Sequence, residues 1–282
     1  MNADAMNADN VNNKVFEEYA YYYNLLYADK DYVREAKYIK EVVDKHLPTC
    51  CTTEHCKKGE HILNLGCGSG NHDFELAKLG FKITAVDASK SMIECALSKQ
   101  KKDAFYLENI RFILSDICKL NLDASCLDAS YDVVISLFHV SNYFTTNERL
   151  LEFFKQAYRC VKKGGIFIFD SWYGPAVLTQ KPEVRMKKVQ DEHSVIWRMT
   201  TPELKVNQNI VDVNYTLIIK DKLSKQINEI KETHEMRYLF LPEVEIFLEK
   251  VGFKLISAKE FFTENDLDIN TWNSYFVCVK SY

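Results

Sequence analysis

The sequence has little proline and glycine, no excess of positive charge and no long apolar run. Its 282 residues include 5 prolines and 9 glycines, and 36 Lys and Arg residues are set against 40 Asp and Glu residues, for a formal net charge of −4. Nucleic-acid binding needs clustered Lys and Arg, so we expect no nucleic acid as a partner. No apolar run approaches the ~20 residues that cross a bilayer and no segment resembles a signal peptide, so we expect no membrane span and a cytoplasmic location.

The nine cysteines do not form a disulfide framework, which also favours a reducing cytoplasm. Cys50, Cys51, His55 and Cys56 lie close together, but no second pair follows at a spacing that zinc sites use. We therefore interpret this segment as a polar surface loop and expect no metal. With 47% hydrophobic residues, the chain can bury a proper core as one large domain or as a domain with an insert.

What the sequence does contain is a glycine turn between an apolar run and an acid. Residues 62–70 read Ile-Leu-Asn-Leu-Gly-Cys-Gly-Ser-Gly, and Asp87 follows the run 83–86. The first run suits a buried parallel strand, the glycines let the backbone approach a ligand, and a helix should begin near Asn71. Asp87 then ends a second strand, where its carboxylate can accept both hydroxyls of a ribose. This order predicts a nucleoside-binding half-sheet.

The glycine spacing separates this turn from other nucleotide-binding turns. Dinucleotide enzymes use G-x-G-x-x-G, whereas Gly66, Gly68 and Gly70 form G-x-G-x-G here and Asn71 stands where the dinucleotide glycine would fall. No Gly-Lys-Ser/Thr follows, so the turn is not a phosphate-binding P-loop. The run from Leu63 to Gly70 resembles the first motif of class I S-adenosylmethionine-dependent methyltransferases.

Four further segments match this family in the expected order. They are Asp87-Ala-Ser with Met92 behind it, Phe112-Ile-Leu-Ser-Asp116-Ile117, Tyr131 to His139, and Val161 to Asp170. Asn64 departs from the family, which usually has Asp or Glu there, and so supplies no negative charge near the sulfonium. The resemblance implies S-adenosyl-L-methionine as the cofactor and a methyltransferase as the enzyme class.

The resemblance also implies which residues hold the cofactor. In the family the second-strand acid holds the ribose, its neighbours and a following apolar side chain flank the adenine, and the third-strand acid takes the adenine amino group. The tyrosine-rich first helix is similar to the segment that folds over the cofactor in N-methyltransferases acting on amino sugars of nucleotide-sugars. Carried onto this sequence, the cofactor-binding residues are Tyr27, Tyr32, Gly66, Cys67, Gly68, Asp87, Ala88, Met92, Asp116, Ile117 and Phe138.

Aromatic side chains and one histidine are the candidates for the acceptor side. Trp172 and Tyr173 follow the fifth strand and suit a cationic or sugar substrate, because aromatic faces attract ammonium groups by ~0.5–2 kcal/mol. His139 follows the fourth strand near the expected reaction centre, where its imidazole could accept a proton. The predicted catalytic residues are His139 and, as the resemblance of the N-terminal segment implies, Tyr27. The predicted substrate residues are Tyr23, Tyr143, Trp172 and Tyr173.

The order of elements predicts an α/β fold with an insert. Residues 1–13 are polar and are predicted to form a disordered tail, and residues 14–59 a helical lid with a linker. Residues 60–171 and 237–282 form the predicted cofactor-binding domain, a Rossmann-like, mostly parallel seven-stranded sheet with helices on both faces. Residues 172–236 predict an antiparallel β insert after strand five that caps the substrate site. The strands expected in this part of the chain are 193–201, 206–220 and 225–240.

The preferred function is transfer of a methyl group to a small polar acceptor by in-line displacement, with alignment as the main catalytic device. The resemblance favours the amine of a nucleotide-linked amino sugar. Basic side chains that could grip its diphosphate are Arg185, Lys187, Lys188 and Arg198. The alternatives are a hydroxyl or carboxyl of another small metabolite, and a cofactor-binding protein without transferase activity. The cap also suggests a homodimer surface, and the number of methyl groups added stays open.

Overall fold

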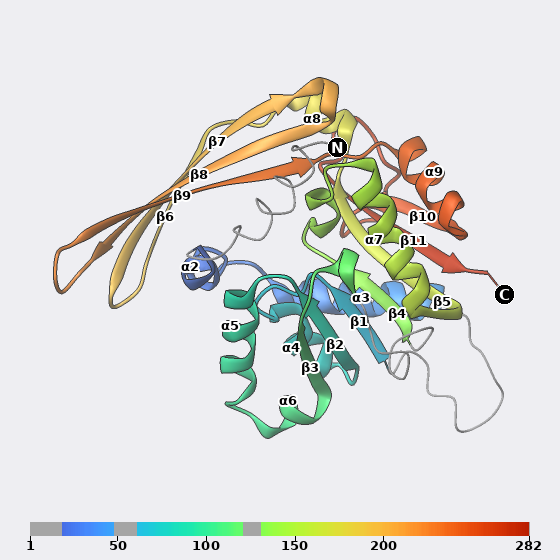
Figure 1. Cartoon of the computed structure of the whole chain (residues 1–282), viewed down its shortest axis with the longest axis horizontal. Helices are drawn as coiled ribbons and strands as arrows, with labels where there is room; N and C mark the ends of the chain where they lie inside the picture. The colour runs from blue at the N-terminus through green and yellow to red at the C-terminus, as the bar shows by residue number, and fades with distance from the viewer. Residues whose placement is uncertain (1–18, 48–60, 121–130, 282) are drawn as a thin grey trace, which may run out of the picture.

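The computed structural model describes residues 19–47, 61–120 and 131–281, and it confirms the predicted α/β architecture there (Figure 1). The predicted tail of residues 1–13 and the cysteine-rich segment 50–56 lie outside the described residues. No helix in the described ranges is long and apolar enough to cross a membrane.

A mostly parallel seven-stranded sheet lies at the centre of the molecule, with the strand order β10-β11-β5-β4-β1-β2-β3. Strands β1 to β5 run parallel, β11 is antiparallel to β5, and β10 is antiparallel to β11. The chain order reverses between β1 and β4, which is where open α/β sheets leave a crevice for ligands. The strands are β1 (His61–Leu65), β2 (Lys82–Asp87), β3 (Ile110–Leu114), β4 (Tyr131–Ser136), β5 (Val161–Trp172), β10 (Phe253–Glu260) and β11 (Asn273–Lys280).

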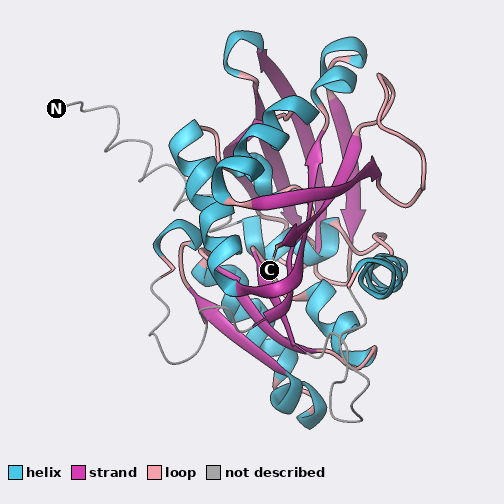
Figure 2. Cartoon of the chain, turned by 90° about the vertical axis from the view of Figure 1, so that its right-hand side faces the viewer, coloured by secondary structure: helices cyan, strands magenta, loops and turns pink. Residues whose placement is uncertain are grey.

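Helices cover both faces of this sheet (Figure 2), as the apolar side chains on its two faces require. On one face Ile39, Phe74 and Ile93 anchor α3, α4 and α5. On the other face Phe153 and Val244 anchor α7 and α9. The helices are α2 (Tyr19–Leu26), α3 (Tyr32–His46), α4 (Asn71–Lys78), α5 (Lys90–Gln100), α6 (Ala104–Asn109), α7 (Asn147–Cys160), α8 (Gly174–Gln180) and α9 (Leu241–Val251), with short 3-10 turns η1 (Ile117–Lys119), η2 (Val140–Tyr143) and η3 (Val206–Gln208).

Local sequence explains where these helices begin and end. The carboxylate of Asp31 accepts from the backbone N–H of Arg34 at 2.9 Å, which caps the start of α3. The helix expected near Asn71 begins at that residue. Helix α9 has Pro242 in its first turn and ends before Gly252, whose φ of +104° suits the residue that follows a helix.

A second, antiparallel sheet extends from the carboxyl end of β5, and we call it the cap. It has four strands in the order β6-β7-β8-β9, one more than the sequence predicted. The missed strand, β6, reads Arg-Met-Lys-Lys-Val-Gln and lies at the edge of the sheet. Its charges hide the strand pattern, because edge strands carry lysines that discourage further pairing. The cap strands are β6 (Arg185–Gln190), β7 (Ser194–Lys205), β8 (Ile210–Asp221) and β9 (Ile227–Arg237).

Helix α2 lies between the cap and α5 (Figure 1). The inner face of the cap buries Ile196 and Leu217 against Tyr23 and Leu26 of α2, and Met92 of α5 joins the same cluster. Helix α2 therefore makes apolar contacts with the cap on one side and with α5 on the other. This arrangement places the predicted lid over the carboxyl ends of the parallel strands.

Candidate functional site

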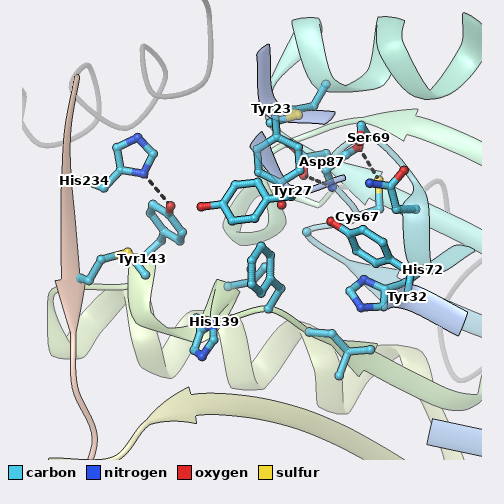
Figure 3. A pocket seen from close by; sticks show the side chains of 18 of the residues that line it. Tyr23, Tyr27, Tyr32, Cys67, Ser69, His72, Asp87, His139, Tyr143 and His234 are labelled. Carbon is cyan, nitrogen blue, oxygen red and sulfur yellow. Dashed lines mark hydrogen bonds between the residues drawn. The ribbon is translucent and has the colours of Figure 1, made fainter. Parts of the chain in front are cut away.

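A cavity of about 270 Å³ lies at the carboxyl ends of the parallel strands, beneath α2 and the cap (Figure 3). Its lining combines the turn after β1, the acid that ends β2, the loop after β4 and side chains of the cap. The predicted site residues that line it are Tyr23, Tyr27, Tyr32, Gly66, Cys67, Gly68, Asp87, Met92, Phe138, His139, Tyr143 and Trp172. Lining residues that were not predicted are Ser69, Asn71, His72, Leu137, Val140, Tyr215, His234 and Met236.

The glycine turn forms one wall of the cavity and has no room for a side chain at Gly66. Its backbone is tied to β2, because the N–H groups of Gly66 and Cys67 both donate to the carbonyl of Val86, at 2.8 and 3.0 Å. Gly66 has a φ of +85°, and a Cβ added there would lie 2.5 Å from a methyl of Val140. A Cβ added at Gly68 would meet nothing within 4 Å, so the space beside the turn is open. The turn therefore presents bare backbone to a ligand.

Asp87 faces this turn from the end of β2. Its carboxylate accepts from the N–H of Gly68 at 2.7 Å and from the N–H of Ser89 at 2.8 Å. Burial raises the pKa of Asp87, while these backbone hydrogen bonds act in the opposite direction. A carboxylate has about four lone-pair directions, so it keeps acceptor capacity for a ligand in the cavity beside its backbone hydrogen bonds from Gly68, Ala88 and Ser89. That Asp87 holds a ribose stays a prediction.

A carboxyl group behind the turn was missed by the sequence analysis. The amide of Asn64 donates to the carboxylate of Asp73 at 2.9 Å, and both side chains are buried. Burial raises the pKa of Asp73 to about 7. Asn64 stands where the family usually has an acid. The carboxyl group of Asp73, nine residues later in the sequence, lies against its amide. Asp73 looked in the sequence like an ordinary acid of a helix's first turn.

The tyrosines of the N-terminal segment close the cavity from above. The rings of Tyr23 and Tyr27 lie 4.7 Å apart, and Tyr27 meets the edge of Phe138 at 5.3 Å. Arg198 of the cap donates to the hydroxyl of Tyr27 at 3.0 Å. Tyr32 packs edge-on against His72, with ring centroids 4.9 Å apart, and burial raises the pKa of Tyr32. The N-terminal segment thus contacts both the cap and the helix that follows the glycine turn.

Lys99 of α5 forms hydrogen bonds with both α2 and the glycine turn. The ammonium of Lys99 donates to the side chains of Asn24, Asn71 and Ser69, at 2.8, 2.6 and 3.1 Å. Burial lowers the pKa of Lys99 to about 8. Because the three acceptors come from α2, α4 and the turn, this lysine fixes the relative positions of three segments that border the cavity.

The loop after β4 is held in an uncommon backbone conformation. Phe138 and His139 have φ values of +68° and +66°, which non-glycine residues rarely adopt. The carboxylate of Asp170 compensates by accepting from both of their N–H groups, at 3.0 and 2.8 Å. The Nε2 of His139 lies 2.8 Å from Oδ1 of Asn273. Asp170 therefore sets the direction of the two side chains that the sequence placed near the reaction centre.

Tyr143 and two residues of β9 meet at the other end of the cavity. The hydroxyl of Tyr143 lies 2.7 Å from Nδ1 of His234 (Figure 3). Nε2 of His234 lies 3.2 Å from the carboxylate of Glu232. The sequence analysis predicted Tyr143 but not His234, because alternation along a strand does not reveal where its face will dock.

Four predicted residues do not line the cavity: Ala88, Asp116, Ile117 and Tyr173. The carboxylate of Asp116 accepts from the N–H of Cys118 at 2.9 Å, and Ile117 is buried in the core beneath α7. Tyr173 is the N-cap of α8, and its N–H donates to the carbonyl of Trp272 at 3.0 Å. Tyr173 thus belongs to the connection between β5 and the cap.

The basic side chains of the cap do not gather into a diphosphate grip. Lys187 donates to both carboxylate oxygens of Asp29 at 2.8 Å, and Arg198 is bound to Tyr27. Lys188 lies over the ring of Trp197, with its nitrogen 5.6 Å from the centroid. Two of these side chains therefore connect the cap to the N-terminal segment.

Comparisons with known proteins agree with this geometry. A family model described as a methyltransferase domain matches residues 56–238, which is more than half of the chain. A putative methyltransferase of Bacillus subtilis (strain 168) is 27% identical over 222 residues, covering 78% of this chain and 84% of that protein.

Two solved structures share the fold. An S-adenosylmethionine-dependent methyltransferase from Clostridium acetobutylicum ATCC 824 superposes with a TM-score of 0.72 at 20% identity, over 95% of this chain and 99% of that one. The sugar N-methyltransferase KedS8 from Streptoalloteichus sp. ATCC 53650 gives a TM-score of 0.73 at 17% identity, over 92% of this chain and 93% of that one.

Proposed function

Because this chain belongs to the S-adenosylmethionine-dependent methyltransferases, we propose that it methylates the amine of a small acceptor, an amino sugar carried on a nucleotide. The observation that carries this proposal is the continuity of one cavity. It joins the glycine turn and Asp87 at one end to Tyr143, Trp172 and His234 at the other. A cofactor and an acceptor can therefore meet in one space that the lid and cap cover.

The residues at the first end fit the adenosyl group of S-adenosylmethionine. The open space beside Gly68 admits a ligand close to the backbone, and the carboxylate of Asp87 keeps lone pairs for ribose hydroxyls. Met92 and Phe138 supply apolar surface for the adenine and the reacting end. When bound, the sulfonium supplies an activated methyl group, whose bond to sulfur breaks as the acceptor nitrogen forms its own bond to carbon.

The second end suits an amine. The aromatic faces of Tyr27, Trp172 and Tyr143 border it, and such faces attract an ammonium group by ~0.5–2 kcal/mol. A bound ammonium must lose a proton before its nitrogen can attack, and His139 and Tyr143 both line this end. The lid and cap exclude water and align the two reactants, a contribution of ~7–11 kcal/mol in well-oriented reactions. The sugar N-methyltransferase activity of the structural neighbour KedS8 supports the same acceptor class.

Methyl transfer to matched acceptors tests this function. The purified protein is incubated with S-adenosylmethionine and with pairs of sugars that differ by an amine or a hydroxyl, each free and nucleotide-linked, and products are weighed by mass spectrometry. We expect the nucleotide-linked amino sugar to gain a methyl group and its hydroxyl analogue to remain unchanged. Methylation of the hydroxyl sugar alone would establish the O-methyltransferase alternative. Cofactor binding without transfer to any acceptor would instead mean a non-catalytic binder.

A homodimer and a cytoplasmic location remain predictions of the same proposal. The outer face of the cap exposes Met186, Met199 and Ile218, which pair or neighbour one another across β6, β7 and β8. Light scattering on the purified protein measures its molar mass in solution, and a dimer doubles that mass. A mass that stays monomeric at high concentration would rule this surface out as a dimer contact.

A further inference from the structure

A buried pair of polar side chains, Asn64 and Asp73, lies behind the glycine turn. Asn64 belongs to β1, just before the turn, and Asp73 to the first turn of α4, just after it. Asn64 is 2% exposed and Asp73 is 0% exposed, and the amide of Asn64 donates to the carboxyl of Asp73 at 2.9 Å. The pair therefore joins the two elements that the turn connects.

The hydrogen bonding of this pair is incomplete. Oδ1 of Asn64 and the second carboxyl oxygen of Asp73 are buried and have no hydrogen-bond partner among the described residues. Burial raises the pKa of Asp73 to about 7, while the hydrogen bonds from Asn64 and from its own backbone N–H act in the opposite direction. Buried polar groups in folded proteins are nearly always paired, so an incompletely paired carboxyl behind a ligand-binding turn indicates a role other than packing.

Asp73 has no counter-charge in the part of the chain that the structure describes. Burial is the main cause of its raised pKa, and the like charge of Asp87 on β2 adds to the rise. No basic side chain of the described ranges forms an ion pair with Asp73. Basic side chains of neighbouring segments are engaged elsewhere: Lys30 and His72 with Glu35, and Lys99 with Ser69 and Asn71. Because an isolated charge is costly to bury, Asp73 keeps its proton up to about neutral pH.

Cys67 connects this pair to the cavity that it lines. Burial raises the pKa of the Cys67 thiol, and the charges of Asp73 and Asp87 both raise it further. The thiol therefore lies within electrostatic reach of both carboxyl groups. His72, which precedes Asp73 in α4, also lines the cavity, and Figure 3 shows Cys67 and His72 at the same end of it. A charge on a ligand beside the turn therefore acts on Asp73 through a medium of low dielectric constant.

We propose that Asp73 is the counter-charge of the cofactor sulfonium, releasing its proton when S-adenosylmethionine binds and regaining one when S-adenosylhomocysteine forms. On binding, the O–H bond of the carboxyl breaks, the proton passes to solvent, and an ionised Asp73 remains near the positive charge. Methyl transfer removes that positive charge, so the carboxylate then takes up a proton from solvent. The site consequently holds the methyl donor more tightly than the demethylated product. The acceptor plays no part in this assignment, which depends on the cofactor alone.

The same assignment explains the amide at position 64. A carboxyl group there would lie against that of Asp73, and two carboxylates in contact cannot both ionise. With an amide at position 64, the pair carries one negative charge, and Asp73 carries it.

Calorimetry in two buffers of different ionisation enthalpy counts the protons released when each cofactor form binds. At pH 7 we expect S-adenosylmethionine to release about half a proton from Asp73 of the wild-type protein, because a carboxyl with a pKa of about 7 is then half protonated. S-adenosylhomocysteine, which lacks the sulfonium, should release fewer protons. In Asp73→Asn this difference between the two ligands should disappear.

The same titrations measure the preference for S-adenosylmethionine over S-adenosylhomocysteine. In the wild type this preference should increase with pH, because binding releases a proton, and should level off above the pKa of Asp73. Asp73→Asn should weaken S-adenosylmethionine binding by about tenfold, the equivalent of one pKa unit, and leave S-adenosylhomocysteine binding unchanged. Asn64→Asp combined with Asp73→Asn exchanges the acid and the amide and should restore the preference. Asp103→Asn, exposed before α6, should leave both affinities unchanged.

Because no acceptor enters these measurements, an amino sugar that stays unmethylated would refute the proposed acceptor and not the role of Asp73. A preference for S-adenosylmethionine that Asp73→Asn leaves intact would overturn the assignment. Equal losses for the two ligands would overturn it as well, since they would mean that Asp73 only supports the turn. So would a proton release that is the same in the wild type and in Asp73→Asn, or a folded exchange variant that lacks the preference.

Discussion

Replacing Asp73 by asparagine should stabilise the protein, by an amount that grows with pH. The carboxylate of Asp73 is fully buried and accepts a hydrogen bond from Asn64. Its other oxygen, and Oδ1 of Asn64, are buried with no hydrogen-bond partner among the described residues. An ionised Asp73 is therefore poorly compensated. An amide of the same shape keeps an acceptor for Asn64 and adds donors, without a charge.

The size of the effect follows from the pKa. Burial raises the pKa of Asp73 from 3.8 to about 7. Between these values the folded protein keeps a proton that the unfolded chain has released, so the free energy of unfolding falls as the pH rises. The stabilisation from this proton is complete below the unfolded pKa and is lost above the folded one. A difference of about three pH units corresponds to up to about 4 kcal/mol.

Urea unfolding of the wild-type protein and Asp73→Asn between about pH 5 and pH 8 measures this difference. The advantage of the variant should increase through this range and level off above the folded pKa. Asp29→Asn is a matched control. Its hydrogen bond with Lys187 lowers the pKa of Asp29, so this carboxyl is ionised throughout the range, and the stability of the variant relative to the wild type should not change with pH. A stability difference for Asp73→Asn that does not change with pH would refute the reasoning.

Further predictions concern the walls of the cavity. Tyr27→Phe removes the hydroxyl that accepts from Arg198 but keeps the ring, so turnover should fall while thermal melts show little loss of stability. Full activity would mean that this part of the lid does not act on the substrates. Lys99→Met removes the ammonium that joins α2, the turn and α4, so calorimetry should show S-adenosylhomocysteine binding about tenfold more weakly, by roughly 1.4 kcal/mol. Gly66→Ala places a Cβ 2.5 Å from Val140 at a φ of +85°, so it should lower the melting temperature and abolish cofactor binding; a native-like variant would show that the loop can shift.

The part of the fold around the glycine turn could be predicted, because the residues that determine it are close together in the sequence. A strand, three glycines and an acid at a fixed spacing dictate a turn and its partner strand, and the structure has β1, the turn, α4 and β2 at those residues. The φ values at Gly66, Gly68 and Gly70 are all positive, which explains why glycine was needed.

The end of the cavity near Tyr143 could not be predicted in the same way, because it is formed by contacts between segments that are far apart in the sequence. His234 stands 91 residues from Tyr143, and no spacing rule connects them. Asp170 was read as the end of a motif, yet its carboxylate holds the backbone of Phe138 and His139. The edge strand β6 was missed for a different reason, because its lysines hide the alternation that marks the strands beside it.

Calorimetric titration of S-adenosylhomocysteine into the wild-type protein and Asp87→Asn tests the central claim, that the cofactor binds between the glycine turn and Asp87. The substitution keeps the size of the side chain and removes the charge that would bind the ribose hydroxyls. We predict saturable binding to the wild type and a loss of ~1.5–3 kcal/mol, or about 10- to 150-fold, in the variant. Asp103→Asn, at the start of α6, controls for the substitution itself and should bind normally. Equal affinity of a folded Asp87→Asn and the wild type, or no binding to either, would contradict the account.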